Sequence, residues 1–147
     1  MITKMCLLTA ALLSPMALAA TSLEVTQAYA RATPPNAVTS AVFATISNHD
    51  SQDHYIVAAL TPAAGKAELH DVITEGEIMK MRQVSSFKLP AGGSLQLKPG
   101  SFHIMLFDLS QPLITGTEIE VELQLENGEI YRFDAPVKKV RAGMHQH

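Results

Sequence analysis

Histidine and methionine side chains recur at spacings that could build one metal site. His103 and Met105 are two residues apart, as are Met79 and Met81, and His70 ends a short alternation of apolar and polar residues. In an extended strand, residues two apart leave the same face about 7 Å from each other. Three segments of the chain therefore present imidazole and thioether groups, and no carboxylate is needed to complete a site.

These groups favour a soft metal ion. A thioether is a neutral ligand that suits Cu(I) and binds Zn, Mg or Ca poorly, whereas imidazole is compatible with copper in either oxidation state. Imidazole coordinates only when it is neutral, so we expect binding to weaken as the pH falls through about 6. The residue types alone leave open the plainer interpretation, in which each Met fills the core and each His lies at the surface.

The order and spacing of these residues resemble a known family. His70, ten residues, Met81, twenty-one residues, His103, one residue and Met105 reproduce the H-x10-M-x21-H-x-M signature of the periplasmic Cu(A) chaperone family, PCuAC. The resemblance covers nearly all of the chain after residue 19. It includes the segments Met79 to Arg82, Leu89 to Gly93, Leu97 to Gly100, His103 to Leu106 and Gln111 to Leu113.

This resemblance implies a cupredoxin-like β-barrel that binds Cu(I) through His70, Met81, His103 and Met105. It also implies delivery of copper to the Cu(A) subunit of cytochrome c oxidase or to Sco-type copper proteins. Some members of the family carry Met directly after the first His. Asp71 holds that position here, which excludes a fifth thioether from it.

Two further groups are candidate auxiliary ligands. Met79 lies outside the signature, and we interpret it either as a side chain that shields the ion or as packing. Met144, His145 and His147 form a second cluster at the end of the sequence. It is either a frayed polar end or an arm that captures copper, with Cu(II) bound through His145 and His147.

The elements that must position these residues are predicted to be strands. The clearest runs from Glu118 to Glu126, where apolar and polar residues alternate. A three-residue loop with a left-handed Gly128 gives the hairpin that follows it a consistent face, pairing Leu123 with Tyr131 and Val121 with Phe133. Further strands are expected at Leu23 to Arg31, Val38 to Asn48, Tyr55 to Leu60, Ala67 to Ile73, Ile78 to Gln83, Ser94 to Lys98 and Phe102 to Leu109.

Short strands at this spacing predict an all-β sandwich or barrel, and the resemblance makes it cupredoxin-like, of Greek-key type. On the strand from Phe102 to Leu109, we expect Ile104 and Leu106 to face the core, opposite the His and Met. His49 and His54 flank a turn and are expected to be exposed.

Composition limits the remaining possibilities. The chain has 147 residues, 47% of them hydrophobic and 17% charged, with a formal net charge of -3. This balance excludes the basic face that nucleic acid requires, and the apolar content argues against disorder. One domain is expected, over residues 20–140, followed by a flexible Met/His tail over residues 141–147.

Residues 1–19 have the pattern of a secretory signal peptide: a basic start, an apolar run and Ala17-Leu18-Ala19 before cleavage. We therefore expect a periplasmic protein, monomeric, with no membrane span in its mature form. Its single Cys, Cys6, leaves with the signal peptide, so blue-copper electron transfer, which needs a thiolate, is excluded.

No hydrolase triad, H-E-x-x-H motif or pair of catalytic carboxylates stands out, so a non-enzymatic carrier is expected. Storage of copper or copper resistance, and an exported structural domain without a metal, remain as alternatives.

Overall fold

The computed structural model describes residue 11 and residues 22–140. Apart from residue 11, the expected signal peptide lies outside the described residues, and so does the whole of the expected tail with Met144, His145 and His147. The regular elements of the described residues are ten β-strands, which confirms the all-β class. None of these residues forms a helix that could cross a membrane.

The last two strands form the hairpin that the alternation predicted. β9 (Glu118–Leu125) and β10 (Ile130–Lys138) are antiparallel. Gly128 closes the turn with a φ of 89°, a left-handed conformation that glycine adopts without strain. Both predicted residue pairs form, Leu123 with Tyr131 and Val121 with Phe133.

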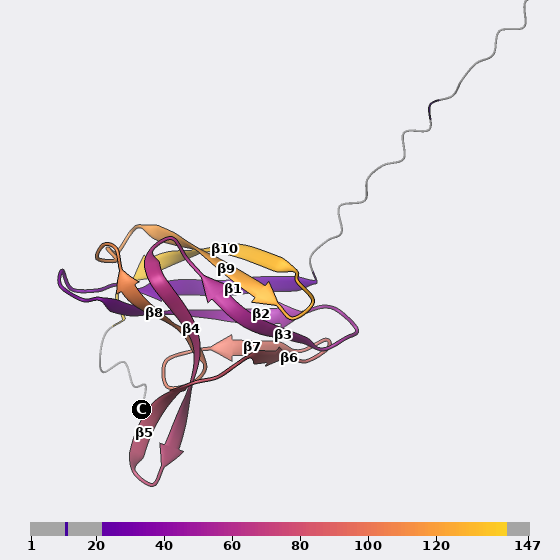
Figure 1. The fold of residues 1–147 in the computed structure, drawn as a ribbon, viewed down its shortest axis with the longest axis horizontal. Helices are drawn as coiled ribbons and strands as arrows, with labels where there is room; N and C mark the ends of the chain where they lie inside the picture. Colours follow the sequence, from indigo (N-terminus) through magenta and orange to yellow (C-terminus); the bar gives the residue numbers. More distant parts are fainter. Residues whose placement is uncertain (1–10, 12–21, 141–147) are drawn as a thin grey trace, which may run out of the picture.

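The strands follow one continuous path of hydrogen-bonded neighbours, β5-β4-β8-β2-β1-β10-β9-β3-β6, with β7 beside β2 (Figure 1). The remaining strands are β1 (Leu23–Arg31), β2 (Thr39–Asn48), β3 (His54–Leu60), β4 (Ala64–Glu75), β5 (Ile78–Gln83), β6 (Phe87–Leu89), β7 (Ser94–Leu97) and β8 (His103–Leu109). β1 pairs in parallel with β10, and the other pairings among the described strands are antiparallel. Because β8 lies between β4 and β2, the chain must cross over between sheet neighbours, as in a Greek key.

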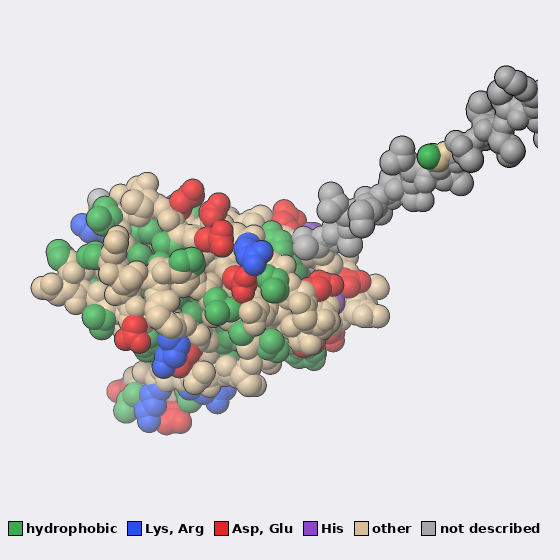
Figure 2. Space-filling model, turned by 45° about the horizontal axis from the view of Figure 1, so that its top comes forward, with side chains coloured by type: hydrophobic (Ala, Val, Ile, Leu, Met, Phe, Trp, Pro, Cys, Tyr) green, Lys and Arg blue, Asp and Glu red, His purple; other side chains and the backbone are tan. Residues whose placement is uncertain are grey.

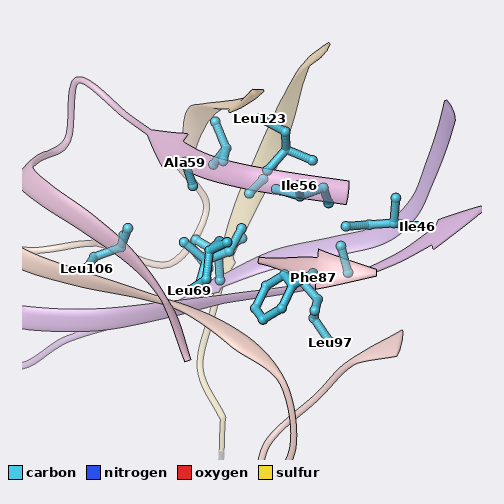
Figure 3. Close-up of a cluster of buried hydrophobic side chains, with 14 of the residues drawn as sticks. Ile46, Ile56, Ala59, Leu69, Phe87, Leu97, Leu106 and Leu123 are labelled. Carbon is cyan, nitrogen blue, oxygen red and sulfur yellow. The ribbon is translucent and has the colours of Figure 1, made fainter. Parts of the chain in front are cut away.

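The strands form two layers that enclose one hydrophobic core: a first layer of β5, β4, β8, β2 and β1 with β7, and a second layer of β10, β9, β3 and β6. Figure 3 shows Leu69 and Leu106 on one side of it and Ile56, Ala59 and Leu123 on the other. Ile104 and Leu106 are fully buried, as expected for the core face of β8. The opposite face of β8, which carries His103 and Met105, is therefore the outer face of its layer.

The expectation that His54 is exposed was wrong. His54 is buried, and its Nε2 lies 2.8 Å from Asp50 Oδ2, while Glu126 Oε1 lies 3.5 Å from its Nδ1. The hydrogen bond with Asp50 raises the pKa of His54 above its ordinary value, although burial acts in the opposite direction. A polar residue next to a turn is buried here because two carboxylates hold it.

Candidate metal centre

Three neighbouring strands carry the predicted ligands. β4 lies between β5 and β8, so the segments that present His70, Met81 and the His103–Met105 pair are adjacent. His70 and His103 are direct partners across the β4–β8 ladder, and Met105 lies two residues further along the same face of β8.

Met81 joins this face from the other side. It is the cross-strand partner of Val72 on β4, and Val72 lies two residues from His70. Since side chains of direct partners share a face, Met81 projects from the same side of the sheet as His70. The structure therefore places all four predicted ligands on one outer face.

The imidazoles belong to a row of aromatic rings across this face. The neighbouring centroid distances are 5.1 Å for Tyr29–Phe43, 6.3 Å for Phe43–His103, 5.6 Å for His103–His70 and 5.9 Å for His70–Phe107. An ion held about 2 Å from one nitrogen of each ring allows two imidazole centroids to lie up to roughly 6–7 Å apart. The separation of His70 and His103 fits one shared ion.

Cationic side chains cover two rings of this row, Phe43 near one end and Phe107 at the other. The Arg31 guanidinium lies 5.5 Å from the centroid of Phe43, and Lys66 Nζ lies 5.0 Å from that of Phe107. These contacts shield the apolar rings from water while the charged groups remain partly solvated. They help to explain how an outer face of the sheet is covered well enough to bury His103.

His103 is held in one protonation state by its surroundings. Burial lowers its pKa, which favours the neutral ring, although a backbone hydrogen bond opposes this shift. Its Nδ1 lies 2.8 Å from the carbonyl oxygen of Ser101. A carbonyl can only accept, so Nδ1 carries the hydrogen and Nε2 keeps the free lone pair.

In His70 the other ring nitrogen, Nε2, makes the hydrogen bond. Its Nε2 lies 2.8 Å from Glu68 Oε2, and its Nδ1 is buried without a hydrogen-bond partner. The hydrogen bonds from His70 and Lys66 hold the pKa of Glu68 below its usual range. The ionised carboxylate accepts the Nε2 hydrogen, so Nδ1 is the bare nitrogen of the tautomer that this contact selects.

A cavity of about 270 Å³ opens beside these ligands. Met81, His103 and Met105 line it, together with Arg31 from β1 and Gly100 from the turn before β8. His70 is not part of the lining. The cavity gives an ion or an incoming group access to both thioethers from solvent.

β5 presents its methionines openly. It is the edge strand of the path, and Met79 and Met81 are 62% and 59% exposed. Met79 shares the face of Met81 but does not pack into the core, which argues against the packing interpretation. Figure 2 shows acidic and basic side chains mixed over the projecting β4–β5 hairpin at the bottom of the view, where Lys80 lies 3.3 Å from Glu75.

The donor set suits a soft ion. Within residues 22–140, no three His, Cys, Asp or Glu side chains gather into a group that could hold a metal, so the ligands that hard ions prefer are not assembled there. Two neutral imidazoles and two thioethers instead match Cu(I), and the buried bare Nδ1 of His70 lacks the partner that a metal would supply. Asp71 lies on the other face of β4, 3.8 Å from Arg82, away from this set.

Sequence reasoning missed Glu68 and Ser101, the groups that orient the two imidazoles. Glu68 could have been found, because it lies two residues before His70 and so shares its face in a strand. The Ser101 carbonyl is a backbone group, and no residue type signals it.

Comparison with known proteins gives consistent matches. The family model described as "Putative lipoprotein LpqE-like" matches residues 23–137. The protein "Putative lipoprotein Lxx21020" of Leifsonia xyli subsp. xyli is 36% identical over 100 residues, which are 67% of this chain and 60% of that protein. RP573 of Rickettsia prowazekii is 30% identical over 83 residues, which are 56% of this chain. The chain thus spans 60% and 46% of the lengths of these curated relatives.

Solved structures share the fold. The solution structure of CuI-DR1885 from Deinococcus radiodurans is 32% identical, with a TM-score of 0.64 and coverage of 82% of both chains. The apo form of DR1885 is matched over 95% of this chain and 96% of that one, with a TM-score of 0.65 and 29% identity. The copper-bound PCuAC domain from PmoF2 has a TM-score of 0.69 over 81% of this chain and 94% of that one, and its 16% identity shows the fold alone.

Proposed function

The chain belongs to the LpqE-like family, its resemblance to PCuAC domains is confirmed, and from this premise we propose that it is a Cu(I)-binding metallochaperone. Its ligands are His70, Met81, His103 and Met105. It holds copper as cargo and performs no catalytic step. The copper named for the solved relatives DR1885 and PmoF2 supports this choice of metal.

The observation that carries the proposal is the pairing of His70 with His103. The two residues are separated by thirty-two positions in the chain, yet they are direct partners on adjacent strands with ring centroids 5.6 Å apart. Each ring has one nitrogen satisfied by the protein and the other free of a protein hydrogen bond. Two such nitrogens beside two thioethers form a ready site for a soft cation.

Transfer by ligand exchange follows from the unequal exposure of the ligands. Met81 is on an exposed edge strand, whereas His103 is buried. An acceptor thiolate or imidazole can reach the ion from the cavity and displace the neutral thioether of Met81 first. The imidazoles then release the ion in turn, and a thiolate acceptor makes the exchange favourable because it binds Cu(I) more strongly than a thioether does.

We further propose that the protein works in the periplasm after cleavage of residues 1–19. Its acceptor is the Cu(A) subunit of cytochrome c oxidase or a Sco-type assembly partner. In the same proposal, Met144, His145 and His147 form an auxiliary arm that captures Cu(II). The family resemblance and the composition of these segments support these assignments.

The first experiment is a Cu(I) competition titration of the mature protein against a chromophoric chelator. We expect one tightly bound Cu(I) per chain, a large loss of affinity in Met81→Ala, and little change in a protein truncated before Met144. Met81 is mostly exposed, so its replacement should leave stability unchanged. Equal, weak binding by all three forms would overturn the proposal.

Delivery and storage are separated by adding an acceptor. Loaded protein is mixed with the copper-free soluble Cu(A) domain of cytochrome c oxidase or with a Sco-type protein, and copper is measured on each partner after separation. Delivery predicts transfer faster than release to buffer. Retention of copper with every acceptor would favour a storage role.

A further inference from the structure

The two histidines of the site are anchored by different groups. Glu68 Oε2 lies 2.8 Å from Nε2 of His70, and the Ser101 carbonyl lies 2.8 Å from Nδ1 of His103. Each anchor accepts a hydrogen from one ring nitrogen and so decides which nitrogen stays bare. The anchors engage opposite nitrogens of the two rings.

We propose that Glu68 is a positioning residue that fixes His70 with its hydrogen on Nε2, so that His70 binds copper through Nδ1 while His103 binds through Nε2. This inference rests on the proposed function, because it assigns nitrogen atoms within that site. It adds a carboxylate that the ligand signature does not contain.

The surroundings of Glu68 support this role. Glu68 and His70 lie two apart on β4, so both side chains leave the outer face. Their side chains are only 17% and 12% exposed, which makes the hydrogen bond between them hard for water to replace. Lys66 Nζ lies 3.2 Å from Glu68 Oε1, so one carboxylate oxygen is tied to the cation and the other to the imidazole.

The unpartnered nitrogen is the second, independent observation. Nδ1 of His70 is buried without a partner, and a buried polar atom without a hydrogen bond costs free energy. A metal ion supplies the missing partner without disturbing Nε2. A carboxylate that holds the far nitrogen of a ligating histidine also fixes the ring orientation and makes the near nitrogen more basic.

The test compares Glu68→Ala, which removes the acceptor, with Glu68→Gln, which keeps an acceptor oxygen but loses the charge. Glu122→Ala is the matched control, because Glu122 is 20% exposed and paired with a cation, Arg132, at 2.8 Å on the other layer. Two readouts are needed. Long-range ¹H–¹⁵N NMR of the copper-free protein reports which imidazole nitrogen carries hydrogen, and Cu(I) competition reports affinity.

We expect His70 to carry hydrogen on Nε2 and His103 on Nδ1 in the copper-free protein, with the His70 signals assigned by their loss in His70→Gln. Glu68→Ala should leave His70 as a mixture of tautomers and weaken Cu(I) binding by about 10–100-fold. Glu68→Gln should recover much of both, and Glu122→Ala should change neither.

Three results would overturn the inference. One is hydrogen on Nδ1 of His70 in the unaltered protein. Another is a Glu68→Ala variant with unchanged tautomer and affinity. The third is equal loss of affinity in Glu68→Gln and Glu68→Ala with the tautomer preserved, since that would make Glu68 a ligand. The expected tautomers in a protein that fails to bind Cu(I) would overturn the proposed function instead and leave the positioning role of Glu68 standing.

Discussion

At the scale of single residues, histidine performs two separate tasks in this protein. His70 and His103 each keep one nitrogen free of protein hydrogen bonds, as a metal site requires. His54 is instead held between carboxylates, with Asp50 at 2.8 Å and Glu126 at 3.5 Å. It ties the loop before β3 to the end of β9, so it contributes to stability and not to binding.

The His54 contact predicts a defined pH dependence of stability. The pKa of His54 is raised above its ordinary value of 6.5, chiefly by the hydrogen bond with Asp50. The folded protein therefore holds this proton more tightly than the unfolded chain. The stabilisation is complete below the unfolded pKa and is lost as the pH rises through the folded pKa.

This is measured as the free energy of urea unfolding for the unaltered protein and for His54→Gln at pH 5.5, 7 and 8.5. The difference between the two proteins should be largest at pH 5.5 and smallest at pH 8.5. His49→Gln is the control, because His49 forms an exposed pair with Glu24 that contributes little. A His54→Gln difference that stays constant over this range would contradict the assignment.

At the scale of elements, the pairing of β4 with β8 positions the site. This ladder sets His70 opposite His103, and near its start Gly65 lies close to Asp108. A Cβ on Gly65 would lie 3.0 Å from the Cβ of Asp108, closer than two such atoms normally approach. Asp108 is also held at a φ of 55°, in the left-handed region that costs a non-glycine residue free energy.

Gly65→Ala should therefore destabilise the protein by about 1–3 kcal/mol, as overpacking does elsewhere. Because the obstacle is the Cβ of Asp108, the double variant Gly65→Ala with Asp108→Gly should recover most of this loss. Urea unfolding of both variants and of Asp108→Gly alone measures the coupling. Additive effects of the two substitutions would show that the two residues do not clash.

The sequence predicted some elements well and others not at all. The bounds of β1 and β5 and the pairing within the β9–β10 hairpin follow from local alternation and turn chemistry, and they are confirmed. β6 was missed, because three residues are too few to show a period. The adjacency of β5, β4 and β8 could not be predicted from local pattern either, since it depends on where the whole chain folds back.

The candidate site also has features that local sequence predicts and features that it does not. The spacing of His103 and Met105 predicts a shared face from the strand period alone. The direct pairing of His70 with His103 and the burial of His54 depend on partners distant in the chain, so local sequence does not show them.

At the scale of the whole molecule, stability and binding are placed on opposite faces of one layer. The inner face of β4 and β8 carries Leu69, Ile104 and Leu106, and the outer face carries the candidate ligands. Within residues 22–140, the second layer contributes core residues and no candidate ligand. Substitutions in that layer should therefore change the free energy of unfolding without changing the affinity for Cu(I).

Leu123→Ala tests this separation, because Leu123 is fully buried on β9, in the second layer (Figure 3). The lost contacts and the cavity should lower the free energy of unfolding by about 2–5 kcal/mol. Ile56→Val, at a fully buried position on β3, should lower the free energy of unfolding by about 0.5–1.5 kcal/mol. It is the variant to use if Leu123→Ala leaves too little folded protein.

Met81→Ala is the reciprocal variant, expected to lose Cu(I) affinity at unchanged stability. If a core variant that remains folded also loses Cu(I) affinity, the two faces are coupled. Loosening the second layer must then reach His70 and His103 through Leu69 and Ile104, the core residues next to them in the chain.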